Sequence, residues 1–499
     1  AFLAGRSRLY EETVELLLGL GRRAEAFECA ERAKSRALLD LIGGRGGGAA
    51  GLRSFGGLRV QRLKRRLEAV YRRIFQRADE PDARSMRAVA EAQREASVLE
   101  REIGSILRRR AAEDPRSAVI ETVQVPRLDE VRSRLADDET LLEYFAAGDR
   151  LHTFVVTREH LYVLSSSRLD GGVSRVLARF HFHLSKFQRP GAADQELVLE
   201  ATRRNLQRLA DALLGPVADT LAGRRLVIVP HGDLHVVPFH ALPWGDGWLC
   251  DQFEVVYAPS AGVYGRCADR SDRSDGEPSV FGLPDELAPQ IAQEARDVAA
   301  ALGTQRVLVG GDATIARLRD AARSSRVLHV ATHGMFRHAS PMLSSIRMAD
   351  GWLNLYDLYD LDVRAELVVL STCESGTAGV TAGDEIVGLN RGFLHAGAPA
   401  LLTSQWRVSD AATTLFMRAF YAHLEFTGDA AAAHRAAMLE LRETHPHPYF
   451  WAPFFLTGRP LRDPSGTSAV RAREHAAAAA ACSSTTDPMV GPYERRDDE

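Results

Sequence analysis

Hydrophobic residues follow a helical pattern at the start of the chain. Within residues 9–42 they recur every three or four positions, and Gly19 and Gly21 interrupt the pattern. This predicts two helices joined by a turn. One such pair leaves part of its apolar face uncovered, so we expect either further repeats upstream of Ala1 or a following domain that the pair caps. The absence of an initial methionine also indicates a fragment.

Two longer helices are predicted after a glycine-rich segment. Residues 43–57 have the composition of a flexible linker, and residues 58–77 and 83–110 predict a helical hairpin that is dense in arginine. A solvated charged surface is the favoured interpretation of these arginines, and contact with an acidic partner is the alternative. Tyr71 and Phe75 are spaced like a packed helical stripe rather than a base-stacking platform. Direct nucleic-acid binding is therefore not expected.

From Thr140 onward, short runs of β-forming residues alternate with helical stretches in two blocks, which a polar linker at residues 269–277 separates. This alternation predicts an α/β fold with a parallel sheet covered on both faces. The predicted strands are Thr140–Phe145, Leu151–Thr157, His160–Leu164, Leu226–Pro230, Ser279–Leu283, Val327–Ala331, Glu366–Ser371 and Ala400–Ser404. The predicted helices span residues 172–187, 195–222, 288–302, 313–323 and 385–396, with more from Ala411.

Composition places the chain among ordinary globular proteins. It has 499 residues, of which 45% are hydrophobic and 26% charged, and this length corresponds to about three domains. The net charge of −3 gives no bulk attraction to nucleic acid or to anionic membranes. No apolar run approaches the roughly 20 residues that span a bilayer, and residues 1–20 lack the pattern of a secretory signal. We expect a cytoplasmic protein that contacts no membrane.

Cysteine and histidine spacing argues against metal sites. The five cysteines have no C-x-x-C spacing and are Cys29, Cys250, Cys267, Cys373 and Cys482. This disfavours a disulfide framework and a zinc ribbon, and it predicts a reducing compartment. His231 and His235 lie four residues apart in a Gly-Asp turn without further ligands, so structural hydrogen bonds are favoured over a metal. Gly310–Asp312 is too short for a phosphate loop, and we expect neither metal nor cofactor.

Two predicted strands lead into residues that carry chemistry. Val327–Ala331 runs into His333, and residues 366–371 run into Cys373. Because the carboxyl ends of neighbouring parallel strands meet at one edge of a sheet, we expect His333 and Cys373 to lie side by side. The imidazole would promote the thiolate and protonate a leaving amine, while the N–H groups of Gly334 and Cys373 would hold an oxyanion. From spacing alone, a buried cysteine and a simple turn remain the alternative.

Several motifs, in order, resemble the CHAT domain, a family of caspase-like cysteine peptidases often attached to tetratricopeptide repeats. The resemblance covers roughly residues 140–460, and the helix after Gly21 resembles the end of a tetratricopeptide array. The motifs are Pro230–Leu242, Ala331–Gly334, Leu370–Gly376, Gly383–Leu389, Phe393–Ala398, Trp406–Asp410 and Trp451–Phe455.

This resemblance implies the caspase fold of clan CD, related to separases, with His333 and Cys373 as the catalytic dyad. It implies an α/β sandwich around a parallel sheet, made of a pseudo-caspase half at residues 136–275 and an active half at residues 276–462. The remaining regions are then a tetratricopeptide-type helical pair at 1–42, a linker and helical hairpin at 43–135, and a disordered tail at 463–499.

The activity that the resemblance implies is hydrolysis of peptide bonds in a specific protein substrate. Bacterial relatives of this arrangement act in defence, which implies activation by a regulatory protein or a ribonucleoprotein bound to the N-terminal helices, in a defence or signalling pathway. RNA-guided effector complexes and gasdermin-type pore formers are the kinds of partner implied. A non-catalytic interaction scaffold is the alternative, and the intact His333 and Cys373 disfavour it.

The substrate pocket is less clearly specified. In clan CD peptidases the segment after the strand at Ala400–Ser404 lines the groove, which makes Trp406 and Arg407 candidate substrate-binding residues. Trp406 is either a subsite wall or an ordinary packing aromatic. Asp384 is either the floor of a pocket for Arg or Lys or, as favoured, the N-cap of the helix predicted from Glu385. Separase-like relatives often carry an acidic residue where Arg407 stands, so a simple arginine-specific pocket is not expected.

Overall fold

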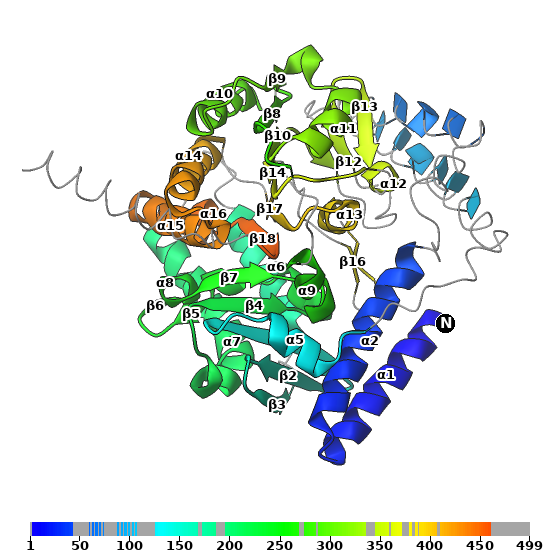
Figure 1. Ribbon diagram of the computed structural model, residues 1–499, viewed down its shortest axis with the longest axis vertical. Helices are drawn as coiled ribbons and strands as arrows, with labels where there is room; N and C mark the ends of the chain where they lie inside the picture. Colours follow the sequence, from blue (N-terminus) through cyan, green and yellow to red (C-terminus); the bar gives the residue numbers. More distant parts are fainter. Residues whose placement is uncertain are drawn as a thin grey trace, which may run out of the picture.

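The computed structural model describes most of the chain. The described residues are 2–42, 125–167, 172–185, 195–268, 274–285, 288–335, 345–358, 361–371, 379–381, 385–387, 389–406 and 410–460, with separate helical positions between 59 and 106. The N-terminal helices lie at one side of a large α/β body (Figure 1). None of the described helices combines the length and the apolar composition needed to cross a membrane.

One sheet of eleven strands runs through the molecule (Figure 1). Its spatial order is β3-β2-β1-β4-β7-β18-β17-β14-β10-β8-β9. Neighbouring strands pair in parallel except for β1–β2, β2–β3 and β17–β18. The strands are β1 (Glu139–Ala147), β2 (Arg150–Val156), β3 (Leu161–Ser167), β4 (Arg225–Val229), β7 (Glu254–Tyr257), β8 (Ser279–Gly282), β9 (Val307–Val309), β10 (Val327–Ala331), β14 (Leu367–Ser371), β17 (Ala400–Ser404) and β18 (Phe454–Gly458).

Helices and three small sheets surround this central sheet. The α-helices are α1 (Phe2–Gly19), α2 (Arg23–Ile42), α5 (Leu128–Arg134), α6 (Gly172–Ser185), α7 (Gln195–Leu213), α8 (Leu249–Gln252), α9 (Ala261–Ala268), α10 (Ile291–Ala301), α11 (Ile315–Ser324), α12 (Leu355–Leu358), α13 (Leu389–Ala396), α14 (Asp410–Thr427), α15 (Ala430–Thr444) and α16 (Pro448–Trp451). Short 3-10 helices are η4 (Gly215–Thr220), η5 (Gly232–Val236), η6 (Phe239–Ala241) and η7 (Gly310–Asp312). The small sheets are β5–β6 (Pro243–Trp244, Gly247–Trp248), β11–β12–β13 (Gly334–Met335, Ser345–Met348, Gly351–Asn354) and β15–β16 (Gly379–Thr381, Glu385–Val387).

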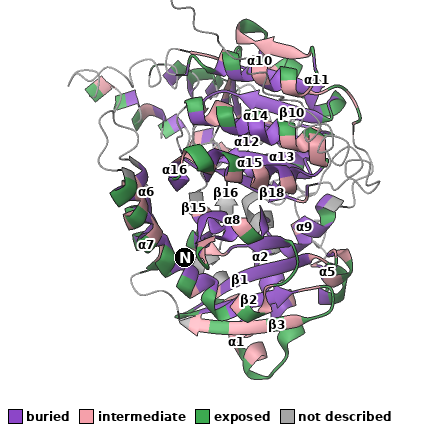
Figure 2. Cartoon of the chain, turned by 90° about the vertical axis from the view of Figure 1, so that its left-hand side faces the viewer, coloured by how far each residue is buried: buried purple, intermediate pink, exposed green. Residues whose placement is uncertain are grey.

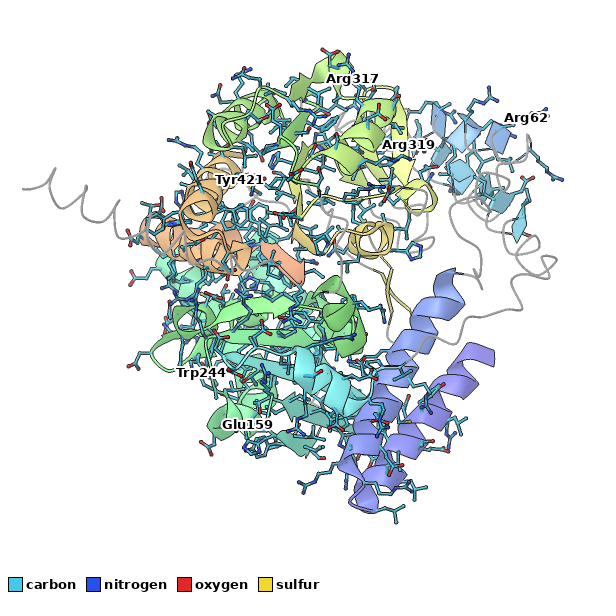
Figure 3. All side chains as sticks on the ribbon, in the orientation of Figure 1. Arg62, Glu159, Trp244, Arg317, Arg319 and Tyr421 are labelled. Atoms are coloured by element: carbon cyan, nitrogen blue, oxygen red, sulfur yellow. The ribbon has the colours of Figure 1, made fainter. Side chains whose placement is uncertain are left out.

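Residues of the central strands divide between two core layers. In β14, Leu367 and Val369 join the core that contains α10 and α14, whereas Val368 and Leu370 join a second core with α11 and α13. Adjacent strand residues point to opposite faces, so a continuous apolar run buries both. Buried strands lie between the flanking helices (Figure 2), and charged side chains such as those labelled in Figure 3 lie on the outside. The predicted α/β class, with a largely parallel sheet and N-terminal helices, is confirmed.

Two short strands that the sequence analysis did not predict join the sheet into one. β7 and β18 pair in parallel, with Thr457 opposite Tyr257. The ring of Tyr257 stacks on Phe455 with centroids 4.5 Å apart. Strands from residues 139–257 and from residues 279–458 therefore form one continuous sheet.

Two predicted helices differ from the structure in extent. The helix predicted over residues 195–222 ends at Leu213, because Gly215 and Pro216 follow and the chain continues as η4. The other difference lies at residues 385–396, where helix α13 begins only at Leu389.

The segment from Glu385 to Val387 is a strand rather than the first turn of α13. Ile386 and Val387 are β-branched, and this segment pairs with Gly379–Thr381 as the β15–β16 hairpin. The N-cap interpretation of Asp384 is therefore wrong, and Asp384 itself lies outside the described residues.

Helix α2 is bound to the loops that follow β4 and β7. The carboxylate of Glu31 accepts hydrogen bonds from the backbone N–H groups of Ala261 and Gly262, each at 2.8 Å, at the start of α9. Lys34 donates to the carbonyl oxygen of Pro230 at 3.0 Å and lies 3.5 Å from Glu143. Burial, with the charge of Glu31, raises the pKa of Glu143 well above its usual value. The N-terminal helices thus share a buried polar interface with the sheet.

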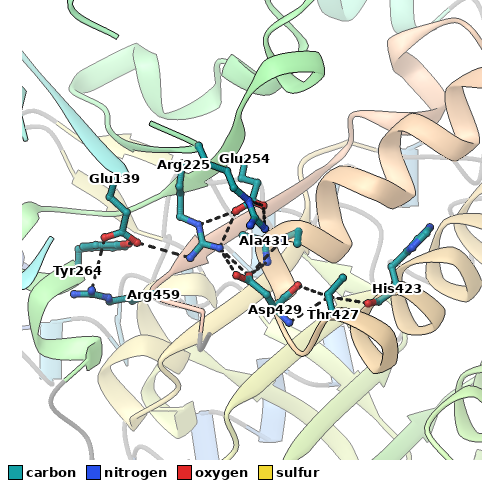
Figure 4. Close-up of polar contacts among 11 residues, drawn as sticks. Glu139, Arg225, Glu254, Tyr264, His423, Thr427, Asp429, Ala431 and Arg459 are labelled. Carbon is teal, nitrogen blue, oxygen red and sulfur yellow. Dashed lines mark hydrogen bonds and ion pairs between the residues drawn. The ribbon is translucent and has the colours of Figure 1, made fainter. Parts of the chain in front are cut away.

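Arg225, at the start of β4, lies at the centre of a buried ionic cluster (Figure 4). Its guanidinium donates to Glu254 at 2.8 Å and to Asp429 at 2.6 Å, and it lies 3.8 Å from Glu139. Asp429 also accepts from the N–H of Ala431 at the start of α15. Burial alone would lower the pKa of Arg225, but the carboxylates of Asp429 and Glu254 raise it. The cluster connects β1, β4, β7 and α15.

The substitution Arg225→Ala should destabilise the protein strongly, because it leaves buried carboxylates without their cation. We expect the free energy of unfolding to fall by about 3–5 kcal/mol, measured by urea denaturation. The control is Arg317→Ala, since Arg317 pairs with Asp312 at an exposed position; its effect should stay below about 1 kcal/mol. Equal effects of the two substitutions would contradict the central role of Arg225.

Two buried histidines fix the segment that leads into β18. His240 donates through Nε2 to the carbonyl oxygen of Ala452 at 2.9 Å, and its Nδ1 accepts from the hydroxyl of Tyr257 at 2.9 Å. His434 donates through Nε2 to the carbonyl oxygen of Phe454 at 2.9 Å. Burial lowers the pKa of His240 to about 3 and that of His434 to about 4. Both rings are therefore neutral at physiological pH.

These histidines should make the protein acid-labile. In the unfolded chain a histidine titrates near 6.5, so below this pH the unfolded state binds protons that the folded state does not. We expect the free energy of unfolding to fall between pH 6.5 and about 4, by up to roughly 1.4 kcal/mol per pH unit for each histidine. His434→Gln should reduce the slope of the free energy of unfolding against pH by the contribution of one titrating histidine. The slope is measured by urea denaturation at a series of pH values. An unchanged slope would mean that His434 is not held neutral.

Candidate functional site at the carboxyl edge of the sheet

Strands β10 and β14 are adjacent, parallel and end at the same level. Ala331 lies opposite Ser371, and the N–H of Thr332 donates to the carbonyl oxygen of Ser371 at 3.3 Å. His333 and Cys373 each follow their strand by two residues. The strand adjacency that the predicted dyad requires is therefore present. Cys373 itself lies outside the described residues, so its place beside His333 stays a prediction.

His333 is buried at this edge and is bonded to a carboxylate. Its Nε2 lies 2.9 Å from Oδ1 of Asp285, and 6% of the residue is exposed. Asp285 comes from the loop after β8, which is parallel to β10, with Gly282 opposite Ala331. The carboxyl-terminal ends of the three neighbouring strands β8, β10 and β14 therefore meet at the site. The sequence analysis missed Asp285, although the same edge argument applied to residues 279–283 would have indicated it.

The carboxylate of Asp285 is held in one orientation by two further donors. Oδ1 accepts from the N–H of Ala288 at 3.1 Å, and Oδ2 accepts from the guanidinium of Arg347 at 2.7 Å. Because bonds between charged groups are strong and directional, Arg347 fixes Asp285, and Asp285 in turn orients the ring of His333.

The small sheet β11–β12–β13 holds the backbone around His333. The N–H of Arg347 donates to the carbonyl oxygen of His333 at 2.9 Å, and the hydroxyl of Thr332 donates to the carbonyl oxygen of Arg347 at 2.8 Å. Gly334 lies in β11 opposite Ile346. The role of its N–H group in an oxyanion hole stays a prediction.

A groove of about 390 Å³ adjoins this arrangement. It is lined by residues that follow β8 and β9 and by the turn between β12 and β13. Its lining residues are Leu283, Gly310, Gly311, Arg347, Met348, Ala349, Asp350, Gly351 and Trp352. Arg347 is thus shared between the groove and the Asp285–His333 pair.

The remaining candidate residues lie in other settings. Trp406 is buried; its indole N–H donates to the carbonyl oxygen of Tyr449 at 3.1 Å, and its ring packs edge-on against Phe180 at 5.5 Å. These contacts match a packing aromatic. Arg407 lies outside the described residues. Nδ1 of His231 accepts from the N–H of Ala146 at 3.0 Å, and nowhere in the described part of the chain do three His, Cys, Asp or Glu side chains converge as metal ligands.

Two of the described cysteines, Cys29 and Cys250, are not activated thiols. Cys29, Cys250 and Cys267 are buried, and no disulfide joins them to one another. Burial raises the pKa of Cys29, and it raises that of Cys250 to about 12. Because the thiolate is the reactive form, Cys29 and Cys250 are held in the unreactive protonated state at neutral pH.

Cys29 and Cys250 should therefore resist alkylation in the folded protein. At pH 7.5 we expect iodoacetamide to modify them at least about 100-fold more slowly than in 8 M urea, measured by mass spectrometry of their peptides. Modification at comparable rates in both conditions would contradict their burial.

A family model described as "CHAT domain" matches residues 203–459. Two relatives match the chain in sequence, both named "Tetratricopeptide repeat protein 28". The protein from Mus musculus is 29% identical over 334 residues, covering 53% of this chain and 14% of its own length. The protein from Homo sapiens is 28% identical over 334 residues, covering 53% and 13%. This chain therefore spans about one seventh of the length of these relatives.

Among solved structures, two crystal structures of the Saccharomyces cerevisiae separase–securin complex are similar to this chain. One has a TM-score of 0.49 and 9% sequence identity, covering 77% of this chain and 34% of the matched chain. The other has a TM-score of 0.46 and 10% identity, covering 76% and 34%.

Proposed function

The chain belongs to the CHAT domain family, and on that premise we propose that it is a cysteine endopeptidase with Cys373 as nucleophile and His333 as general base and acid. The observation that carries the proposal is the buried imidazole of His333, held by Asp285 at the edge where β10 and β14 end level. An imidazole bonded to a carboxylate on one nitrogen is oriented to exchange a proton on the other.

The proposed reaction begins with proton transfer from the thiol of Cys373 to Nδ1 of His333. The proton on Nε2 stays there and is donated in a hydrogen bond to the carboxylate of Asp285, whose negative charge stabilises the imidazolium. The thiolate attacks the carbonyl carbon of the scissile peptide, and the N–H groups of Gly334 and Cys373 stabilise the oxyanion. Nδ1 then protonates the departing amine, which leaves a thioester. Water hydrolyses the thioester and regenerates the thiol.

The surroundings of the site support a polypeptide substrate. The groove of about 390 Å³ is lined in part by Arg347, which bonds Asp285, and glycines at 310, 311 and 351 also line it. A backbone without side chains permits close approach of a peptide main chain. Asp384 and Arg407 remain proposed pocket residues.

We further propose that residues 136–275 act as a structural pseudo-caspase half and residues 276–462 as the active half. A protein or ribonucleoprotein partner that binds the N-terminal helices would switch the site on, in a cytoplasmic defence or signalling pathway. The polar contacts of Glu31 and Lys34 support this route, because they tie α2 to the sheet.

A non-catalytic scaffold is the second candidate function. It is supported by the name of the relatives, which describes a tetratricopeptide repeat protein. The two candidates differ in the reactivity of one thiol.

An iodoacetamide probe at pH 7 should label Cys373 at least about tenfold faster than Cys29, Cys250 and Cys267. His333→Ala should abolish this preference, because no imidazolium then stabilises the thiolate. Labelling is measured by mass spectrometry with and without a candidate activator. Equal labelling of Cys373 in the wild-type protein and in His333→Ala, under both conditions, would favour the scaffold. Incubation with a proteome, followed by mapping of new N-termini that are absent with Cys373→Ala, then identifies substrates.

Asp285→Asn should impair catalysis through the orientation of His333. The amide cannot balance an imidazolium, so we expect kcat to fall by about 10²–10⁴ and the pH midpoint of Cys373 alkylation to rise. Asp350→Asn is the matched control, because Asp350 lines the groove but accepts from the N–H of Ile315 instead. A pH midpoint unchanged in Asp285→Asn would contradict the assigned role.

A further inference from the structure

We propose that the helical hairpin between residues 59 and 106 regulates the site by docking on Trp352, which positions His333 through Arg347 and Asp285. The proposal rests on the proposed function, because it takes His333 as the catalytic base. It adds a control element that neither the family match nor the dyad itself contains.

The first step is the contact between the hairpin and β13. The hairpin forms a small apolar cluster of its own, and within the described residues Trp352 is its one member from outside the hairpin. In Figure 1 the hairpin lies beside β13. The cluster consists of Leu63, Leu67, Val70, Ala92, Ala96, Leu99, Ile103 and Trp352.

The second step is the pairing of Trp352 with Arg347. The two residues are directly opposite in the β12–β13 pair, so their side chains project from the same face of the small sheet. The next pair, Ile346 and Leu353, faces the other way and is buried in the core with α11 and α13. One face of the small sheet is thus anchored in the core, and the opposite face carries the docked tryptophan and the arginine.

The third step is the chain of polar contacts from Arg347 to His333. Arg347 bonds Asp285 at 2.7 Å, and Asp285 bonds His333 at 2.9 Å. Trp352 and Arg347 also line the groove beside the site. A change in the packing around Trp352 therefore reaches both the carboxylate that orients the imidazole and the wall of the groove.

The hairpin can move as a unit, because within the described residues its apolar cluster reaches the rest of the molecule through Trp352 alone. Its cluster is separate from the two large cores of the sheet, and ion pairs such as Arg59–Glu102 and Arg73–Glu95 link its two helices to each other. Undocking would keep these ion pairs and break the contact with Trp352. A small, separable cluster is typical of elements with low local stability.

The experiment compares the pH dependence of Cys373 alkylation in four variants of the full chain. Trp352→Ala removes the docking residue, Trp352→Phe keeps an aromatic ring, and the double variant Leu67→Ser/Leu99→Ser disrupts the hairpin from its own side. Trp248→Ala is the control, because Trp248 is 6% exposed and Trp352 is 7% exposed, and both lie on short strands of small sheets. Trypsin cleavage within residues 59–106 reports undocking.

We expect Trp352→Ala and the hairpin double variant to be cleaved faster in the hairpin and to raise the pH midpoint of Cys373 alkylation by about one unit. At pH values well below the midpoint this corresponds to a roughly tenfold slower reaction. Trp352→Phe should restore most of the wild-type midpoint, and Trp248→Ala should leave it unchanged.

A hairpin that is cleaved faster while the midpoint stays at the wild-type value would overturn the proposal, even if His333→Ala still alters the midpoint. If the pH midpoint of Cys373 alkylation is the same in His333→Ala as in the wild-type protein, the proposed catalytic pair itself is contradicted. This outcome distinguishes a failure of the proposed function from a failure of the regulatory proposal. An equal shift in Trp248→Ala would also overturn the proposal, because the effect would then follow from general destabilisation.

Discussion

The level ending of β8, β10 and β14 is the constraint on which the candidate site depends. Gly282, Ala331 and Ser371 lie side by side across three parallel strands, so the loops that follow begin at the same edge. A shift of register by one residue would turn each strand's side chains to the opposite face. The two-sided burial of these strands prevents such a shift, and it thereby sets the distance between Asp285 and His333.

The same kind of contact, a carboxylate held by an arginine, serves two different purposes in this fold. At Arg225 the groups are almost completely buried, and the contact joins strands and a helix into one body. At Arg347 the side chain is 34% exposed, and the contact leaves a groove open beside it. The first arrangement contributes to stability, whereas the second orients an imidazole next to a space that a ligand can enter.

The N-terminal segments reach the sheet at two separate places. Helix α2 binds the loops after β4 and β7 through Glu31 and Lys34, and the hairpin packs on Trp352 near the other end of the sheet. The upstream region therefore contacts both the first strands and the surroundings of the site. A partner that binds upstream can act on either contact without entering the groove.

The sequence by itself determined short strands rich in β-forming and apolar residues, such as Val327–Ala331 and Ala400–Ser404, because hydrophobic pattern and β-propensity are local properties. The sequence also predicted that His333 and Cys373 follow neighbouring strands, and the structure places β10 beside β14. Only the tertiary structure decided the pairing of β7 with β18, the strand at Glu385–Val387 and the bond from His333 to Asp285. The physical reason is that these features depend on partners far away in the chain, and no local period or propensity records which partner will lie opposite.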